Sequence, residues 1–157
     1  MEQKKIGKSV YEYSPTSFWS VFLQSSPCIH DKVLSRSSYK GRCNSPYIAA
    51  LDYVANRTMV DERIDSLCCG HNTWEDCTRQ RIEEECGTDS ATRFGSFLEK
   101  TFGGVASVMC PRNIFPPTGK VCKQSLPPVG TKPRGKVSDH FIGRYLNSYL
   151  SFLFNNA

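Results

Sequence analysis

The fold of this chain is decided by residues 68–86, which read CCGHNTWEDCTRQRIEEEC. Adjacent cysteines rarely bond to each other, because a disulfide needs convergent side chains with Cα atoms about 5.5–6 Å apart. Cys68 and Cys69 are therefore expected to reach two different partners. Cys77 and Cys86 lie nine residues apart, which places them on opposite faces of a helix. They too need separate partners, so the helix that carries them is predicted to be central.

Cysteine is several times more frequent than in an ordinary chain, with 8 among 157 residues. An even number at this density is typical of secreted, disulfide-bonded proteins. Only 39% of the residues are hydrophobic, so the core is thin and benefits from covalent links. We predict that every cysteine is paired, although eight cysteines allow 105 connectivities and the sequence does not choose among them. The cysteines are Cys28, Cys43, Cys68, Cys69, Cys77, Cys86, Cys110 and Cys122.

The predicted compartment is extracellular, with a cytosolic protein carrying free thiols as the alternative. Residues 18–23 form the only apolar burst near the start, and it is too short for a signal peptide. We therefore expect the chain to be a fragment or an incomplete gene product. Asn56-Arg57-Thr58 is an N-glycosylation sequon and predicts a glycan on Asn56. No stretch approaches the ~20 apolar residues of a transmembrane span, so none is expected.

Apolar residues at helical spacing and residues that favour helix ends predict four consecutive helices. The first runs over about 46–55 and starts at Ser45-Pro46. The second, 58–69, is expected to end at Gly70, and the third, 73–86, starts at Thr73. A fourth helix starts at Thr88 and carries apolar residues along one face. It is expected to end or kink at Gly103-Gly104, ahead of Cys110.

The fold class is predicted to be mainly α: a small disulfide-stapled helical bundle with a Pro-rich arm and a C-terminal amphipathic helix. Residues 1–42 are interpreted as an irregular N-terminal segment and 43–122 as the cysteine-rich helical domain. A Pro/Gly/basic linker follows at 123–137, within an extended Pro-rich arm that spans 111–133. The amphipathic helix at 138–157 is expected to dock on the domain, or alternatively to bind a membrane surface or a partner.

No catalytic, cofactor-binding or metal-ligating residues are predicted. The stretch from Cys68 to Asn72 resembles the Cys-Cys-x-x-His-Asp motif of secreted phospholipases A2, but one residue instead of two precedes His71, and Asn72 replaces the aspartate. No Cys-x-x-Cys or paired histidine spacing suggests zinc, and no local motif singles out a nucleophile. His71 is interpreted as a turn residue between two helices, and the protein as a non-enzyme.

A second resemblance rests on the double cysteine, the run Thr73-Trp74-Glu75-Asp76-Cys77 and the Glu-rich approach to Cys86. This pattern resembles a family of secreted cysteine-rich proteins of nematodes and arthropods, whose function is unknown. The resemblance covers about 43–122. It implies an α-helical, disulfide-bonded, secreted domain and supplies no catalytic residues.

Three functions are left open. The first is an extracellular binding or structural protein with an unidentified partner. The second is a carrier of an apolar ligand, suggested by the aromatic face of Phe94, Phe97 and Phe102. The third is a binder of anionic surfaces through 100–136, which holds seven basic residues and no acidic one. Nucleic acid is not expected as a partner, because it rarely shares a compartment with disulfides.

Overall fold

The computed structural model describes residues 15–101 and 104–134, and the secondary structure of these residues is helical, with no strand. This confirms the mainly α, disulfide-stapled fold class. The elements are α1 (Pro15–Cys28), the π-helical segment η1 (Ile29–Leu34), α2 (Ser37–Tyr39), the π-helical segment η2 (Lys40–Asn44), α3 (Ser45–Ala55), α4 (Val60–Cys86), α5 (Thr88–Thr101), α6 (Val105–Met109) and α7 (Lys120–Ser125).

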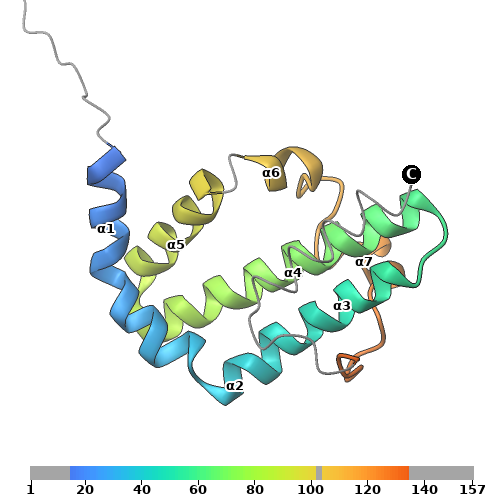
Figure 1. The fold of residues 1–157 in the computed structure, drawn as a ribbon, viewed down its shortest axis with the longest axis horizontal. Helices are drawn as coiled ribbons and strands as arrows, with labels where there is room; N and C mark the ends of the chain where they lie inside the picture. The colour runs from blue at the N-terminus through green and yellow to red at the C-terminus, as the bar shows by residue number, and fades with distance from the viewer. Residues whose placement is uncertain (1–14, 102–103, 135–157) are drawn as a thin grey trace, which may run out of the picture.

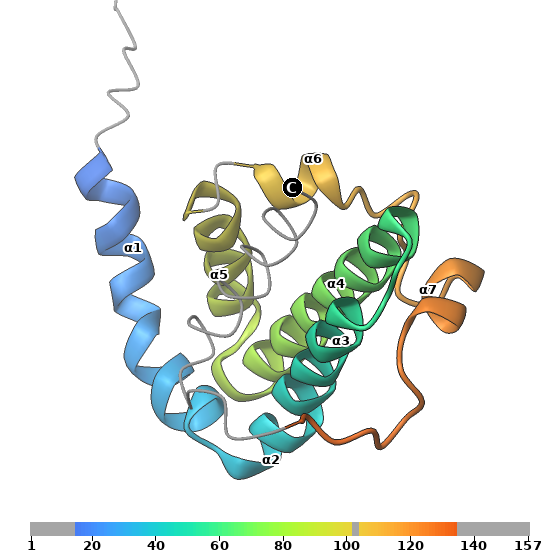
Figure 2. The same cartoon turned by 45° about the vertical axis from the view of Figure 1, so that its right-hand side comes forward.

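Helix α4 is the axis of the fold. It crosses the middle of the molecule, with α3 running alongside it (Figure 1). After a rotation of 45°, α5 and α7 are seen on opposite sides of α4, and α1 lies beyond α5 (Figure 2). Helices α3, α5 and α7 all pack directly on α4. The remaining elements therefore take their positions from this one helix.

Each of the four disulfides has one cysteine in α4. This confirms that Cys68 and Cys69 reach different partners, and that Cys77 and Cys86 do so as well. The links fasten α4 to the end of α1, to η2, to the residue after α6 and to α7. The pairs are Cys28–Cys86, Cys43–Cys77, Cys68–Cys110 and Cys69–Cys122.

The predicted break between two helices at Gly70 is wrong, because α4 runs through it without interruption. Gly70 is buried where α3 crosses closely, and a Cβ placed on it would lie 2.9 Å from the Cβ of Ala50. Thr73 does not cap the start of a helix, since its Oγ1 is buried without a hydrogen-bond partner. Gly70 therefore permits helix contact instead of ending a helix, which shows tertiary packing overriding a local signal.

The interpretation of residues 1–42 as irregular is also wrong for their described part. From Pro15 to Leu34 the chain is helical, first as α1 and then as η1. From Ser37 it runs helically through η2 into α3, so Ser45 follows a residue that already has helical backbone angles and is not a cap. Ile29, Val33 and Tyr39 are buried in the core, which explains why these short segments are ordered.

The fourth predicted helix is confirmed, with a break where the glycine pair was expected. Helix α5 ends at Thr101, and α6 begins after Gly104, whose φ of 71° lies in the left-handed region that glycine adopts without strain. The arm at 111–133 is not extended throughout, because α7 lies within it. Residues 135–137 of the predicted linker and the whole predicted helix at 138–157 lie outside the described residues.

The core is built mainly from aromatic and aliphatic side chains between α3, α4 and the two π-helical segments. Tyr47 stacks on Trp74 with ring centroids 5.4 Å apart, and Phe94 meets the edge of Trp74 at 6.4 Å. Phe97 stacks on Phe22 of α1 at 4.1 Å. Phe94 and Phe97 therefore serve packing, whereas Phe102 lies outside the described residues.

Replacing Gly70 with alanine tests the close contact between α3 and α4. The added methyl group collides with Ala50, and overpacking of this kind costs about 1–3 kcal/mol. Replacing a glycine within a helix by alanine stabilises the folded state by only about 0.5–1 kcal/mol, so we expect a net decrease in the free energy of unfolding. Urea denaturation with the disulfides intact measures it.

Gly41→Ala is the matched control, because nothing lies within 4 Å of a Cβ at this helical position. It should be neutral or stabilise the protein by up to about 1 kcal/mol. Adding Ala50→Gly to the Gly70→Ala variant removes the colliding methyl group and should recover part of the loss. Equal stability of the Gly70→Ala and Gly41→Ala variants would show that the two helices are not in contact at Gly70.

Candidate functional site

The arm after α6 is fastened to α4 at several points, and this creates a wall opposite α3. Two disulfides hold Cys110 and Cys122. The side-chain amide of Asn72 donates to the carbonyl oxygens of Cys110, at 3.2 Å, and Phe115, at 2.9 Å. Ser66 donates to the carbonyl oxygen of Ser125 at 2.8 Å. The start of the arm and α7 are therefore held rigidly against α4.

The end of the arm is anchored on α3. The backbone N–H of Arg134 donates to Oδ2 of Asp52 at 2.7 Å. Between the Ser125 anchor and this contact, residues 126–133 pass over the molecule without any helix. This segment therefore bridges from α7 to α3 and encloses space beneath it.

The space under the bridge is a groove with a volume of about 1320 Å³. Its lining comes from η2, the start of α3, the middle of α4, α7 and the bridging segment. Most of the lining side chains are apolar, including the stacked rings of Tyr47 and Trp74 and the non-polar run Leu126-Pro127-Pro128-Val129. We call this space the apolar groove.

The charges on the apolar groove have one sign. Arg42, Lys123 and Lys132 line it, and all three side chains are exposed. No aspartate or glutamate is among the residues that line it. A ligand in the groove thus meets apolar walls and positive charge at the rim, the arrangement that suits an apolar molecule with an anionic end.

A cluster of polar side chains joins α4 to the start of the arm. The guanidinium of Arg112 contacts Glu75 at 3.1 Å and Asp76 at 2.6 Å, which neutralises this member of the basic stretch. Nε2 of His71 lies 3.9 Å from Oε2 of Glu75. The interpretation of His71 as a turn residue is wrong, because it is buried within a continuous helix.

Burial lowers the pKa of His71, because the interior disfavours the imidazolium ion. The carboxylate of Glu75 opposes this shift, and the positive charge of Arg112 adds to it. His71 is therefore suited to a neutral, structural role beside the ion pairs that hold the arm.

The other predicted site residues have separate locations. Asn56 directly follows α3, is exposed, and donates from its side-chain nitrogen to the carbonyl oxygen of Asp52 at 3.0 Å. The eight cysteines are all consumed in structural disulfides. Within residues 15–101 and 104–134, no cluster of three or more histidine, cysteine or acidic residues could hold a metal ion. Over the same residues, no helix is both long and apolar enough to cross a bilayer.

Comparison with protein-family models, curated proteins and solved structures finds no match to this chain. Functional inference therefore rests on the cavities and their chemistry.

The sequence patterns did not indicate the apolar groove. Its walls come from segments up to about ninety residues apart, such as Gly41 and Lys132. The available signal was the non-polar run that starts at Leu126, which was interpreted only as part of an arm and linker. Lys123 and Lys132 belong to the basic stretch 100–136 that predicts binding to anionic surfaces. Their position beside the groove follows only from the path of the bridge.

The lowered pKa of His71 predicts a pH-dependent stability. In the unfolded chain the imidazole takes up a proton as the pH falls through about 6.5, whereas the folded protein does not until its lower pKa is reached. The free energy of unfolding should therefore fall as the pH drops below about 6.5 and level off below the folded pKa. Urea denaturation between about pH 5 and pH 8 measures this.

His71→Gln should remove that part of the pH dependence, and circular dichroism at neutral pH checks that the variant is folded. Wild-type and His71→Gln curves that run parallel across this range would contradict the interpretation.

Proposed function

We propose that this protein is a secreted, non-enzymatic binding protein whose apolar groove takes a ligand with an extended apolar part and an anionic end. The observation that carries the proposal is the combination of apolar walls with a rim of Arg42, Lys123 and Lys132 and no acidic residue. The groove thus combines the features that suit the two ligand classes expected from the sequence, which are apolar molecules and anionic surfaces.

The apolar walls are expected to supply most of the affinity. Each buried methylene group contributes about 0.8 kcal/mol, so ten contribute about 8 kcal/mol before the cost of association is subtracted. An exposed ion pair adds only about 0.2–1 kcal/mol. The basic rim therefore sets the orientation of the ligand and favours acids over neutral apolar molecules. A fatty acid or a lysolipid with an acidic headgroup has this chemistry.

The aromatic face that first suggested a carrier does not support the proposal. Phe94 is in the core and Phe97 is stacked on Phe22. Support comes instead from Tyr47 and Trp74, whose stacked rings lie in the groove wall. The carrier function thus rests on different residues from those that suggested it.

Secretion is the second part of the proposal, supported by four disulfides and the absence of free thiols among the eight cysteines. Disulfides at this density persist in oxidising compartments. Asn56 of the sequon is exposed at the end of α3, so an oligosaccharide attached to it would extend into solvent. The proposed relation to the secreted nematode and arthropod family rests on the double cysteine, the run from Thr73 to Cys77 and the Glu-rich approach to Cys86.

Mass spectrometry of the protein from its own source tests secretion. We expect the non-reduced polypeptide to lack eight hydrogens relative to the free-thiol form, and the peptide that contains Asn56 to carry a glycan removable by a peptide N-glycosidase. Measurement after blocking free thiols gives the first value. Eight alkylated thiols in the native protein would contradict the extracellular assignment.

Binding of a fluorescent long-chain fatty acid tests the groove. We expect saturable binding of the acid, weaker binding of its neutral methyl ester, and displacement by unlabelled fatty acid. The double variant Lys123→Glu/Lys132→Glu should weaken binding of the acid by about 3- to 30-fold and leave the ester unaffected, since exposed pairs contribute about 0.2–1 kcal/mol each.

Two further variants locate the site. Ser45→Trp places a large side chain in the groove and should abolish binding of both acid and ester. Lys120→Glu is the matched control, because this exposed lysine of α7 is not part of the groove lining and its replacement should have little effect. Absence of saturable binding, or binding that Ser45→Trp leaves intact, would overturn the proposal.

A second candidate function is attachment to an anionic membrane surface. Lys120, Lys123, Lys132 and Arg134 are all exposed on α7 and the bridge. Such attachment should weaken steeply between about 50 mM and 200 mM salt, because exposed charges are screened within about 10 Å at 0.1 M. Lys120→Glu should then reduce vesicle binding as much as Lys123→Glu does, which separates surface attachment from binding in the groove.

A further inference from the structure

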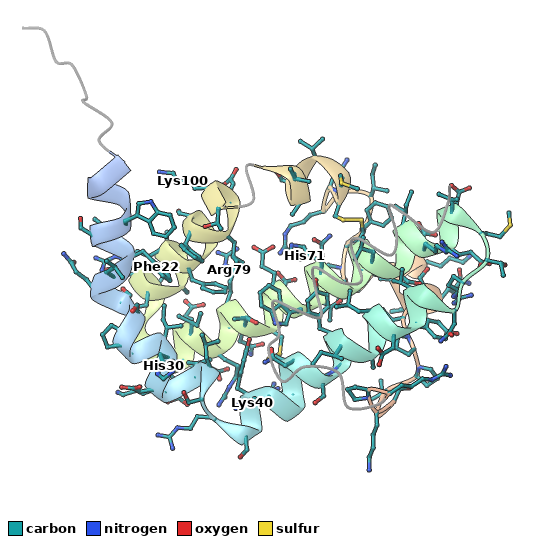
Figure 3. All side chains as sticks on the ribbon, viewed as in Figure 1. Phe22, His30, Lys40, His71, Arg79 and Lys100 are labelled. Atoms are coloured by element: carbon teal, nitrogen blue, oxygen red, sulfur yellow. A yellow bond between two sulfur atoms is a disulfide. The ribbon has the colours of Figure 1, made fainter. Side chains whose placement is uncertain are left out.

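A second cavity lies on the other side of α4, with a volume of about 510 Å³. It is enclosed by α4, by α5 and by the segment from Gly104 to Arg112. Figure 3 shows Arg79 between α4 and α5, and His71 farther along α4 toward α6. We call this cavity the polar cleft. It shares no lining residue with the apolar groove, so the two are separate sites.

The polar cleft contains charges of both signs in equal number. Arg79 and Arg112 are its basic residues, and Glu75 and Glu99 its acidic ones. This balance differs from the apolar groove, whose lining charges are all positive. A ligand with a net charge would be attracted by one pair and repelled by the other, whereas a ligand with separated positive and negative ends can satisfy both.

Two of these four charges are already used within the protein. Arg112 contacts the carboxylate of Glu75 at 3.1 Å, and this pair holds the arm against α4. Arg79 and Glu99 are both exposed, and neither has an ion pair within the described part of the chain. The cleft therefore offers one free positive charge and one free negative charge to a ligand.

The two free charges stand on opposite walls. Arg79 is on α4 and Glu99 is on α5. They are too far apart to form an ion pair with each other, which requires a nitrogen-to-oxygen distance of at most 4.0 Å. Gly95 lies beside Arg79: a Cβ on it would be 3.7 Å from Nε, so a larger side chain would crowd the guanidinium. Ser96, also on α5, adds a hydroxyl group to the lining.

We infer that the polar cleft binds a small zwitterion of the amino-acid class, with its carboxylate on Arg79 and its ammonium group on Glu99. The planar guanidinium of arginine matches a carboxylate with two parallel hydrogen bonds, and a glutamate carboxylate accepts hydrogen bonds from an ammonium group. The cleft volume is within the range of about 300–1,000 Å³ that is usual for small-molecule sites.

Titration of the intact, disulfide-bonded protein with a free amino acid, observed by NMR of its backbone amides, tests the inference. Leucine is the probe, with N-acetyl-leucine and leucine amide as analogues that lack the ammonium charge or the carboxylate. We expect saturable shifts for residues around Gly95 and Ser96 with leucine, and about 2- to 5-fold weaker binding of each analogue, because an exposed ion pair contributes about 0.2–1 kcal/mol. Shifts in the apolar groove should be absent.

Charge-neutral variants assign the two ends of the ligand. Arg79→Gln should weaken leucine binding about 2- to 5-fold and abolish the preference for leucine over its amide. Glu99→Gln should weaken it similarly and abolish the preference over N-acetyl-leucine. Arg81→Gln, on the same helix but outside the cleft, is the control and should bind as wild type does. Gly95→Leu should fill the cleft and prevent binding.

Two outcomes would overturn the inference. No shift of the Gly95 region by leucine at about 10 mM would show that the cleft does not bind this class of ligand. Equal binding of leucine and N-acetyl-leucine, insensitive to Glu99→Gln, would show a simple anion site at Arg79. Because the fatty-acid experiments use groove variants and this one uses cleft variants, failure here leaves the proposed function standing.

Discussion

The structure depends on the covalent attachment of its other segments to one helix. Every disulfide has one cysteine in α4, so breaking any one of them releases a different segment from the same axis. Closing loops of this length restricts the unfolded chain and stabilises a fold by about 2–4 kcal/mol for each bond. The core is thin, and α3 crosses α4 at close range at Gly70. Disulfides and this one close helix contact together substitute for a larger hydrophobic interior.

The adjacent pair Cys68-Cys69 explains how a single helix creates two cavities. Cys69 binds α7 and so positions one end of the bridge over the apolar groove, while Cys68 binds Cys110 at the edge of the polar cleft. Neighbouring residues on a helix point about 100° apart, so the two bonds leave α4 in different directions. Asn72, about one turn further along α4, then fastens the backbone of the arm. Both candidate sites therefore depend on the two different directions in which these disulfides leave α4.

The candidate sites differ in charge because different parts of the chain contribute to them. Glu75 of α4 and Glu99 of α5 line the polar cleft, where Glu75 contacts Arg112 at the start of the arm. The charged residues that η2, α7 and the bridge contribute to the apolar groove are all basic. The segregation of charge along the sequence thus becomes a segregation of charge between two sides of the helix. This supports two ligand classes with different electrostatics, one anionic and apolar, the other zwitterionic.

The sequence by itself determined the helical class, the need for cysteine pairing, the separate partners of Cys68 and Cys69, and the break at Gly104. These follow from local spacing, from disulfide geometry and from backbone freedom, which act over a few residues. Only the tertiary structure decided that Gly70 lies inside a helix, that residues 15–34 and 37–44 are helical, which cysteines pair, and where the two cavities are. The physical reason is that these features depend on contacts between distant residues. Gly70 is needed inside α4 because Ala50 of α3 packs against it, and the cavities form between segments that meet only after the disulfides close four long loops.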